Sequence, residues 1–153
     1  MPNPKPTEPI LYRERVRPNL GTFAAVGVLI PAVTLVSVPF DFRIGLILSL
    51  FMVAGIWAAL YFYSPVISVG RQFLTVGRAS IPRALLGKIV EIPKDQIFFE
   101  RGPALDPASF KVFQGTVKTA IKIVIKDPED PTPYWLVSTR KPSQLATVLR
   151  ATV

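Results

Sequence analysis

The sequence predicts an α+β membrane protein, in which an N-terminal transmembrane helical hairpin precedes a small β-rich domain closed by a C-terminal helix. Two uncharged apolar runs, Leu20–Phe40 and Ile44–Val69, stand a few residues apart, and about 18 apolar residues suffice to cross a bilayer as a helix. Beyond the second run, apolar residues recur with the period of a strand. We therefore expect a mobile, basic, cytosolic leader at 1–19, two membrane helices within 20–64, and a cytosolic domain at 65–153.

The leader is rich in proline and poor in apolar residues, which is typical of extended, mobile chain; its prolines are Pro2, Pro4, Pro6 and Pro9. It ends in a charged collar directly before the first apolar run. Arg13, Arg15 and Arg17 of this collar are candidates for contacts with anionic lipid or a partner protein. The alternative is that the collar serves only as a topology signal with an interfacial tyrosine.

The membrane helices are expected at about 20–39 and 44–64. Pro31 predicts a kink in the first, with Thr34 as the candidate to satisfy the carbonyl group that proline leaves without a donor. Small residues four apart, such as Gly55 and Ala59, predict that helices approach closely. A cleaved signal peptide is the alternative for the first run, but its apolar core exceeds the roughly 7–15 residues of such a signal.

The distribution of charge predicts an orientation. The net charge is +8, with four basic residues before the first apolar run, thirteen after the second, and only Arg43 between them. Because cytoplasmic flanks of membrane helices collect Lys and Arg, both termini are expected in the cytosol of a multi-pass protein. A membrane accounts for the basic balance, so no nucleic-acid partner is expected.

Composition excludes several kinds of chemistry. The chain contains no Cys and no His, which removes thiolate catalysis, the commonest general base and the usual ligands of zinc, haem and iron–sulfur clusters. The acidic cluster Asp127–Asp130 lacks the spacing of a calcium loop. No ionisable residue lies inside either apolar run, which argues against a pore or carrier. We expect no metal, no cofactor and no catalytic residue.

Short β-branched and aromatic runs predict the cytosolic domain to be built of strands, with a helical turn within Lys94–Arg101. The closing helix is expected at about 142–151, where Pro142 suits a first turn. The strands are expected at Val66–Val69, Phe73–Val76, Ile81–Pro82, Lys88–Ile92, Ser109–Gln114, Thr119–Lys126 and Tyr134–Thr139.

Basic side chains supply the candidate contacts of this domain. The strand at Thr119–Lys126 alternates isoleucines with a stripe formed by Lys118, Lys122 and Lys126. This stripe could face anionic headgroups or an acidic partner, or it could be a solvated strand face. Arg71 is expected near the membrane surface, where it could instead be a topology determinant. Ser138–Arg140, including the Arg140 guanidinium, offers an alternative anion pocket at a strand end.

Two resemblances extend this interpretation. Phe73–Gly77, Ile81–Pro82 and the ending Trp135–Pro142 before a helix resemble bacterial pleckstrin-homology-like modules, which implies a PH-like barrel or sandwich. The motif Tyr12–Arg15 before a two-span hairpin, together with Asp130–Arg140, is similar to an actinobacterial family of membrane proteins of unknown function. That resemblance implies the bacterial inner membrane and supplies no activity.

The function that these observations favour is a non-enzymatic accessory, assembly or scaffold subunit of an inner-membrane complex. Its expected partners are the lipid bilayer and another membrane protein or complex, and a homo-oligomer is a further alternative. Recognition of anionic lipid by the cytosolic domain is the second hypothesis. An enzyme that uses Asp, Glu, Lys, Ser or Tyr alone is the third.

Overall fold

The computed structural model describes residues 9–151 of the chain and divides it into two compact units. Among the described residues, one unit combines 9–16 with 65–151, and the other consists of Arg17–Ser64. The polypeptide therefore leaves the first unit, forms the second, and returns to the first.

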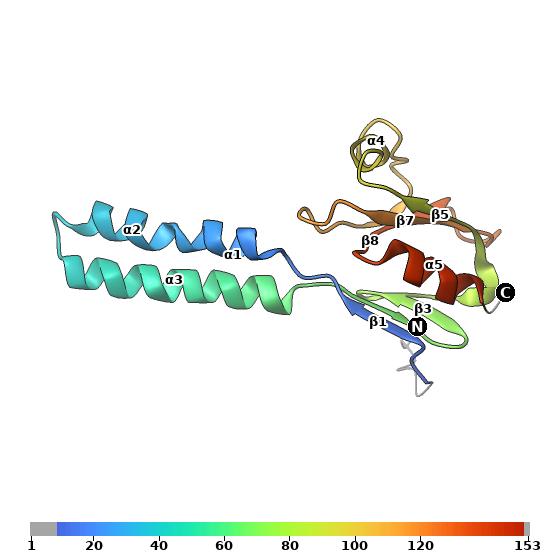
Figure 1. The fold of residues 1–153 in the computed structure, drawn as a ribbon, viewed down its shortest axis with the longest axis horizontal. Helices are drawn as coiled ribbons and strands as arrows, with labels where there is room; N and C mark the ends of the chain where they lie inside the picture. The colour runs from blue at the N-terminus through green and yellow to red at the C-terminus, as the bar shows by residue number, and fades with distance from the viewer. Residues whose placement is uncertain (1–8, 152–153) are drawn as a thin grey trace. The chain divides into compact units, whose positions relative to one another are not determined.

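The second unit is a hairpin of apolar helices, in which α1 (Leu20–Gly27) and α2 (Leu29–Ser37) run antiparallel to α3 (Phe42–Phe62) (Figure 1). The Asn19 side chain caps α1 by accepting the Thr22 N–H at 2.9 Å. Asp41 caps α3 in the same way. Both Leu20–Ser37 and Phe42–Phe62 are long and apolar enough to cross a membrane, and few of their residues are buried within the structure.

A break at Val28 separates α1 from α2, three residues before Pro31. Proline disrupts the helical turn that precedes it because it has no N–H and its ring displaces the carbonyl group four residues earlier. The helix is thus interrupted one turn before Pro31, in the region of the predicted kink, although Val28 keeps helical backbone angles of φ −62° and ψ −20°. The predicted role of Thr34 is wrong, because its hydroxyl lies 3.1 Å from the Ser49 hydroxyl on α3 instead.

Small residues other than the predicted ones bring α2 and α3 together. A Cβ on Gly45 would overlap the Cβ of Ser37, so the two helices meet where Gly45 has no side chain. Thr34 and Ser49 are buried beside this contact. Around Gly55, by contrast, a Cβ would meet no atom within 4 Å. Gly55 therefore does not mediate packing inside the hairpin.

The first sheet of the other unit has strand order β1-β2-β3-β4, with each neighbouring pair antiparallel. Its strands are β1 (Tyr12–Arg15), β2 (Val66–Val69), β3 (Phe73–Val76) and β4 (Ala79–Pro82). The turn between β3 and β4 places Gly77 at φ 62°, a conformation that glycine adopts without a steric cost.

Strand β1 corrects the predicted leader. Residues 12–15 pair with β2 in a register that sets Tyr12 opposite Val69 and Arg15 opposite Val66. The collar has too little apolar content to be recognised as a strand, and its partner lies more than fifty residues away in the sequence. The part of the predicted leader at residues 1–8 lies outside the described residues.

The second sheet has the order β5-β7-β8-β6. Its outer strand β6 pairs with β8 in parallel, while the other pairs are antiparallel. The elements of this half are the 3₁₀ turn η1 (Arg83–Leu85), β5 (Leu86–Ile92), α4 (Ile97–Arg101), β6 (Phe110–Val112), β7 (Ala120–Ile125), β8 (Tyr134–Ser138) and α5 (Pro142–Arg150).

Two apolar clusters stabilise this unit. The larger joins both sheets to α5 through fully buried side chains such as Leu74, Ile121 and Leu149. The smaller gathers Ile97 of α4 with the opposite face of the second sheet, including Leu136. Strand β8 is consequently buried along its whole length. The mixed α+β class is confirmed, with β-sheets following the apolar helices.

Candidate functional site

A cluster of polar groups joins β1 to the end of β8, and we call Tyr12, Glu14, Thr139 and Arg140 the Glu14 junction. The Glu14 carboxylate accepts hydrogen bonds from the Tyr12 hydroxyl at 2.7 Å and from the Thr139 hydroxyl at 2.5 Å. Its other oxygen accepts the backbone N–H of Arg140 at 2.9 Å. One carboxylate thereby connects segments that lie about 125 residues apart in sequence.

Strand geometry explains why these groups meet. Side chains alternate between the two faces of a strand, so Tyr12 and Glu14 share the half-buried face of β1 while Arg13 and Arg15 are exposed. Thr139 follows β8 and is fully buried. Its backbone carbonyl accepts the hydroxyl of Thr119, which holds the end of β8 in place.

The junction favours the protonated form of Tyr12. Burial raises the pKa of the Tyr12 hydroxyl, and the hydrogen bond to Glu14 and the negative charge of that carboxylate raise it further. The phenol therefore remains a hydrogen-bond donor throughout the ordinary pH range. A neutral donor held by a carboxylate is suited to fixing structure rather than to transferring protons near pH 7.

Beside the junction, a surface cavity of about 410 Å³ lies between β1 and α5. Tyr12 forms one wall, and the α5 residues Ser143, Gln144, Thr147 and Val148 form the other. These side chains offer an apolar surface with hydroxyl and amide groups at its margin. The cavity could accommodate a small apolar group or a side chain of a partner protein.

The predicted arginines of the collar do not gather at one place. Arg13 and Arg15 point away from the Glu14 junction. Arg17 belongs to the helical hairpin, where its guanidinium lies 4.6 Å from the centre of the Tyr61 ring and donates to the Tyr61 hydroxyl at 3.2 Å. Arg140 is exposed and enters the junction through its backbone N–H.

The predicted lysine stripe is not a continuous face. Lys118 and Lys126 are exposed outside the ends of β7, whereas Lys122 within it is partly buried. The Lys122 ammonium forms a 2.9 Å ion pair with Glu100 on α4 and lies 4.3 Å from the centre of the Tyr134 ring. The predicted alternation of β7 is correct, but α4 covers the face on which Lys122 lies.

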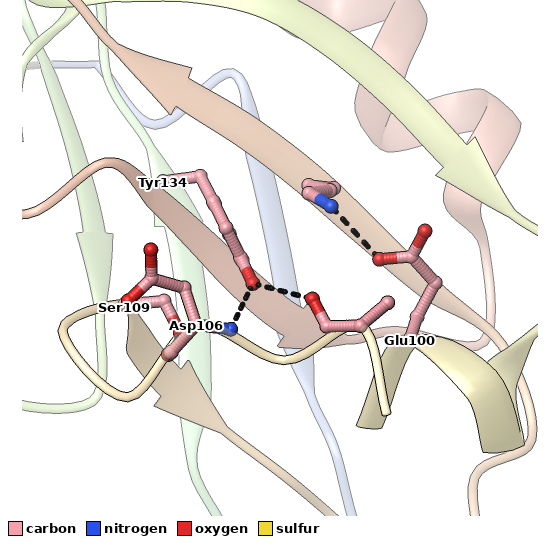
Figure 2. A network of polar contacts seen from close by, with 6 residues as sticks. Glu100, Asp106, Ser109 and Tyr134 are labelled. Carbon is pink, nitrogen blue, oxygen red and sulfur yellow. Dashed lines mark hydrogen bonds and ion pairs between the residues drawn. The ribbon is translucent and has the colours of Figure 1, made fainter. Parts of the chain in front are cut away.

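Figure 2 shows how this covering segment is fastened. The Tyr134 hydroxyl accepts the backbone N–H of Asp106 at 2.8 Å and donates to the Ala104 carbonyl at 3.4 Å. Glu100 on α4 forms its ion pair with Lys122 of β7, the strand next to β8 on which Tyr134 lies. These contacts give the lysine and tyrosine an internal role in the unit.

The two hydroxyl groups of the anion pocket predicted at Ser138–Arg140 have partners within the fold. Ser138 accepts the Arg101 guanidinium at 2.7 Å, and Thr139 donates to the Glu14 carboxylate. A carboxylate beside these donors would repel a second anion.

The acidic cluster serves as turn structure. The Asp127 carboxylate accepts the Glu129 N–H, and the Asp130 carboxylate accepts the Thr132 N–H. Hydrogen bonds from Thr132 lower the pKa of Asp130. Across residues 9–151, no group of three or more acidic side chains is placed to hold a metal ion.

Arg71 lies on the turn between β2 and β3 and lines a pocket of about 380 Å³ together with Arg83. Arg83 is 5% exposed, and its guanidinium donates to the carbonyl groups of Gly70, Val148 and Leu149. Burial lowers the pKa of Arg83.

Sequence reasoning did not select Glu14 or Arg83 as functional residues. Glu14 was hidden inside a basic collar, although it is the acidic residue between Arg13 and Arg15, and that isolation was an available signal. Arg83 follows Pro82 at a strand end, and no local sequence pattern reports that its side chain is buried.

Comparison with known proteins identifies a family. The model of a family described as "Protein of unknown function (DUF3093)" matches residues 11–149. No curated protein and no solved structure matches the chain. The matched residues include β1, the whole hairpin, both sheets and nearly all of α5, so the Glu14 junction lies entirely within them.

Proposed function

We propose that this chain, which belongs to the DUF3093 family of proteins of unknown function, is a non-enzymatic subunit of a membrane complex. In this proposal the helical hairpin spans a bilayer, and the sheet unit acts at the membrane surface as an accessory, assembly or scaffold module. As the sequence resemblances imply, the membrane in this proposal is the bacterial cytoplasmic membrane and the sheet unit is a PH-like module.

The observation that carries the proposal is the pairing of β1 with β2 across the hairpin. Arg15 lies opposite Val66, and the Val16 N–H donates to the Pro65 carbonyl at 2.9 Å. Both ends of the hairpin thus leave from adjacent strands of one sheet. The sheet unit is therefore joined to the hairpin at both ends of the hairpin, and this double connection supports a module that is tethered to the membrane which the hairpin would enter.

An exposed apolar pair supports a protein partner. Phe98 and Phe99 on α4 are 84% and 59% exposed, while their neighbour Ile97 is buried. The ion pair of Glu100 with Lys122 and the hydrogen bonds of Arg101 fix the helix that presents them. Neighbouring exposed phenylalanines on a fixed element are typical of interaction surfaces.

The proposal can be tested by cross-linking mass spectrometry after gentle detergent extraction. We expect one reproducible partner, with cross-links on the sheet unit, and we expect Phe98→Ser/Phe99→Ser to reduce its recovery at least about tenfold. The matched control is Arg78→Gln, an exposed substitution on the β3–β4 turn. A chain recovered reproducibly alone, or a partner insensitive to the phenylalanines, contradicts the scaffold proposal as stated.

Recognition of anionic lipid is a second candidate, favoured by charge. Residues 9–16 and 65–151 carry fifteen basic side chains against eight acidic ones, and Lys118 and Lys126 are exposed. The test needs the full chain, because a fragment beginning at residue 66 lacks β1. Hydrogen exchange in nanodiscs should show protection near these lysines that requires phosphatidylglycerol and is absent in phosphatidylcholine. Equal protection in both lipids would contradict lipid recognition.

A further inference from the structure

We propose that the pocket between the β2–β3 turn and η1 binds a phosphate-type oxyanion through Arg71 and Arg83. This goes beyond the scaffold function and does not depend on it. The pocket has a volume of about 380 Å³, large enough for a phosphate or a phosphomonoester group. Its walls come from the β2–β3 turn, the end of β4, η1 and the first residue of β5.

The first step of the argument is the incomplete set of partners around Arg83. Its side chain is 5% exposed, and its Nη atoms donate to Gly70 at 3.0 Å, Val148 at 2.7 Å and Leu149 at 3.0 Å. Its Nε–H is buried and has no hydrogen-bond partner among the residues that the structure describes. An unpartnered donor on a buried charged group is costly, so the Arg83 guanidinium keeps hydrogen-bonding capacity that the residues around it do not use.

The second step concerns charge. The three acceptors of Arg83 are neutral carbonyl groups, and the two ion pairs found within residues 9–151 involve other residues. The C-terminal carbonyls of α5 offset part of the positive charge through the helix dipole. A guanidinium removed from water without a carboxylate beside it still favours a nearby anion.

The third step is the second arginine. Arg71 is exposed on the turn that ends at the same pocket, so it can approach an anion that contacts Arg83 from within. Guanidinium groups match tetrahedral oxyanions because their planar donors bind two oxygens at once. A buried arginine that is fixed in place and an exposed arginine that can close over the ligand make a site for a phosphate group.

The shared chemistry is a phosphate group, which can come from a soluble phosphate or from a lipid headgroup. The test uses the full chain in phosphatidylcholine nanodiscs, with inorganic phosphate titrated by calorimetry at ionic strength matched with sodium chloride. We expect saturable binding that Arg71→Gln weakens at least about tenfold. Arg78→Gln removes a comparable exposed arginine outside the pocket and should leave binding unchanged.

A second arm places the same proteins in nanodiscs that contain phosphatidic acid, with hydrogen exchange read over residues 70–73 and 83–86. The lipid headgroup is the source of the phosphate if hydrogen exchange shows protection that Arg71→Gln removes and calorimetry shows no binding of free phosphate. Arg83→Lys keeps the charge but loses the planar guanidinium group, and it should abolish binding in protein whose far-ultraviolet spectrum is native. No binding in either arm, or equal effects of Arg71→Gln and Arg78→Gln, overturns the proposal.

Discussion

A single carboxylate joins the chain that precedes the helical hairpin to the chain that follows it. Glu14 precedes the hairpin, whereas Thr139 and Arg140 follow it by more than seventy residues, and the three are joined by hydrogen bonds of 2.5 and 2.9 Å. The two motifs that the sequence singled out, Tyr12–Arg15 and Asp130–Arg140, thus meet in space. Sequence reasoning selected both motifs but could not pair them, since the contact depends on the register of β1 against β2.

Replacing Glu14 by Gln should destabilise the sheet unit by about 1–3 kcal/mol. The amide retains the shape of the carboxylate but replaces charge-assisted hydrogen bonds by weaker ones and places an NH₂ group opposite a donor. Chemical unfolding followed by Trp135 fluorescence measures the change. Arg13→Gln, on the exposed face of the same strand, should change stability by no more than about 0.5 kcal/mol. Equal effects of the two substitutions would show that the junction does not stabilise the fold.

The raised pKa of the Tyr12 hydroxyl leads us to expect a loss of stability at alkaline pH. Its pKa is raised in the folded protein, by burial first and by Glu14 second, so folding favours the neutral phenol. This contribution is fully present below the pKa of an unfolded tyrosine, about 10, and is lost as the pH rises above it. Between about pH 9 and pH 11, wild type should therefore lose more unfolding free energy than Tyr12→Phe.

The comparison with Tyr12→Phe separates this tyrosine from the other groups that titrate in the same range. Tyr63→Phe removes a tyrosine that is 85% exposed and should follow the wild-type pH profile. Parallel pH profiles for wild type and Tyr12→Phe would contradict the assignment.

At the scale of elements, strands with strict alternation could be predicted and those defined by distant partners could not. Thr119–Lys126 was identified from its isoleucines, and the observed β7 buries Ile121, Ile123 and Ile125. Strand β1 was missed because four polar and charged residues form a strand only when β2 supplies hydrogen bonds. The parallel pairing of β6 with β8 was equally beyond local patterns.

The three lysines of the predicted stripe do not form one continuous face, for a related reason. A period of two identifies which residues share a face of a strand, but it does not report what covers that face. Here α4 and the segment after it cover the centre of β7, so Lys122 contacts Glu100 and Tyr134 while Lys118 and Lys126 remain exposed. The sequence therefore identified these residues as basic, but it did not show that the three lysines lie in different surroundings.

Packing within the hairpin gives the third prediction. Gly45→Val should separate α2 from α3, because any Cβ at this position overlaps Ser37 and the added methyl groups overlap further. Since the chain has no native cysteine, a Thr34→Cys/Ser49→Cys pair reports the separation through its rate of disulfide formation in detergent. We expect a reduction of at least about tenfold, consistent with loss of roughly 1.4 kcal/mol of helix contact.

Gly55→Ala provides the matched control, because the added methyl group meets no atom within 4 Å in the hairpin. Its cross-linking rate should equal that of the parent pair. A Gly45→Val protein that cross-links at the parental rate would show that α2 and α3 pack through other residues.

At the scale of the whole molecule, the connection between the sheet and the hairpin predicts membrane topology without reference to charge. Because β1 and β2 are adjacent strands of one sheet, no bilayer can separate the residues before the hairpin from those after it. A membrane-spanning hairpin must then expose the turn at Asp41 on the opposite side. The excess of basic residues outside the hairpin favours the cytosol as the shared side.

This prediction is checked with single cysteines introduced at Leu11, Asp41 and Arg150, labelled by a membrane-impermeant maleimide. In right-side-out vesicles only the Asp41 position should react, and in inverted vesicles only the other two. Reaction of positions 11 and 150 from opposite sides would be incompatible with the β1–β2 pairing and would remove the basis of the scaffold proposal. Reaction of all three from one side would instead leave the sheet intact and show that the hairpin does not cross the bilayer, which separates the fold from its membrane assignment.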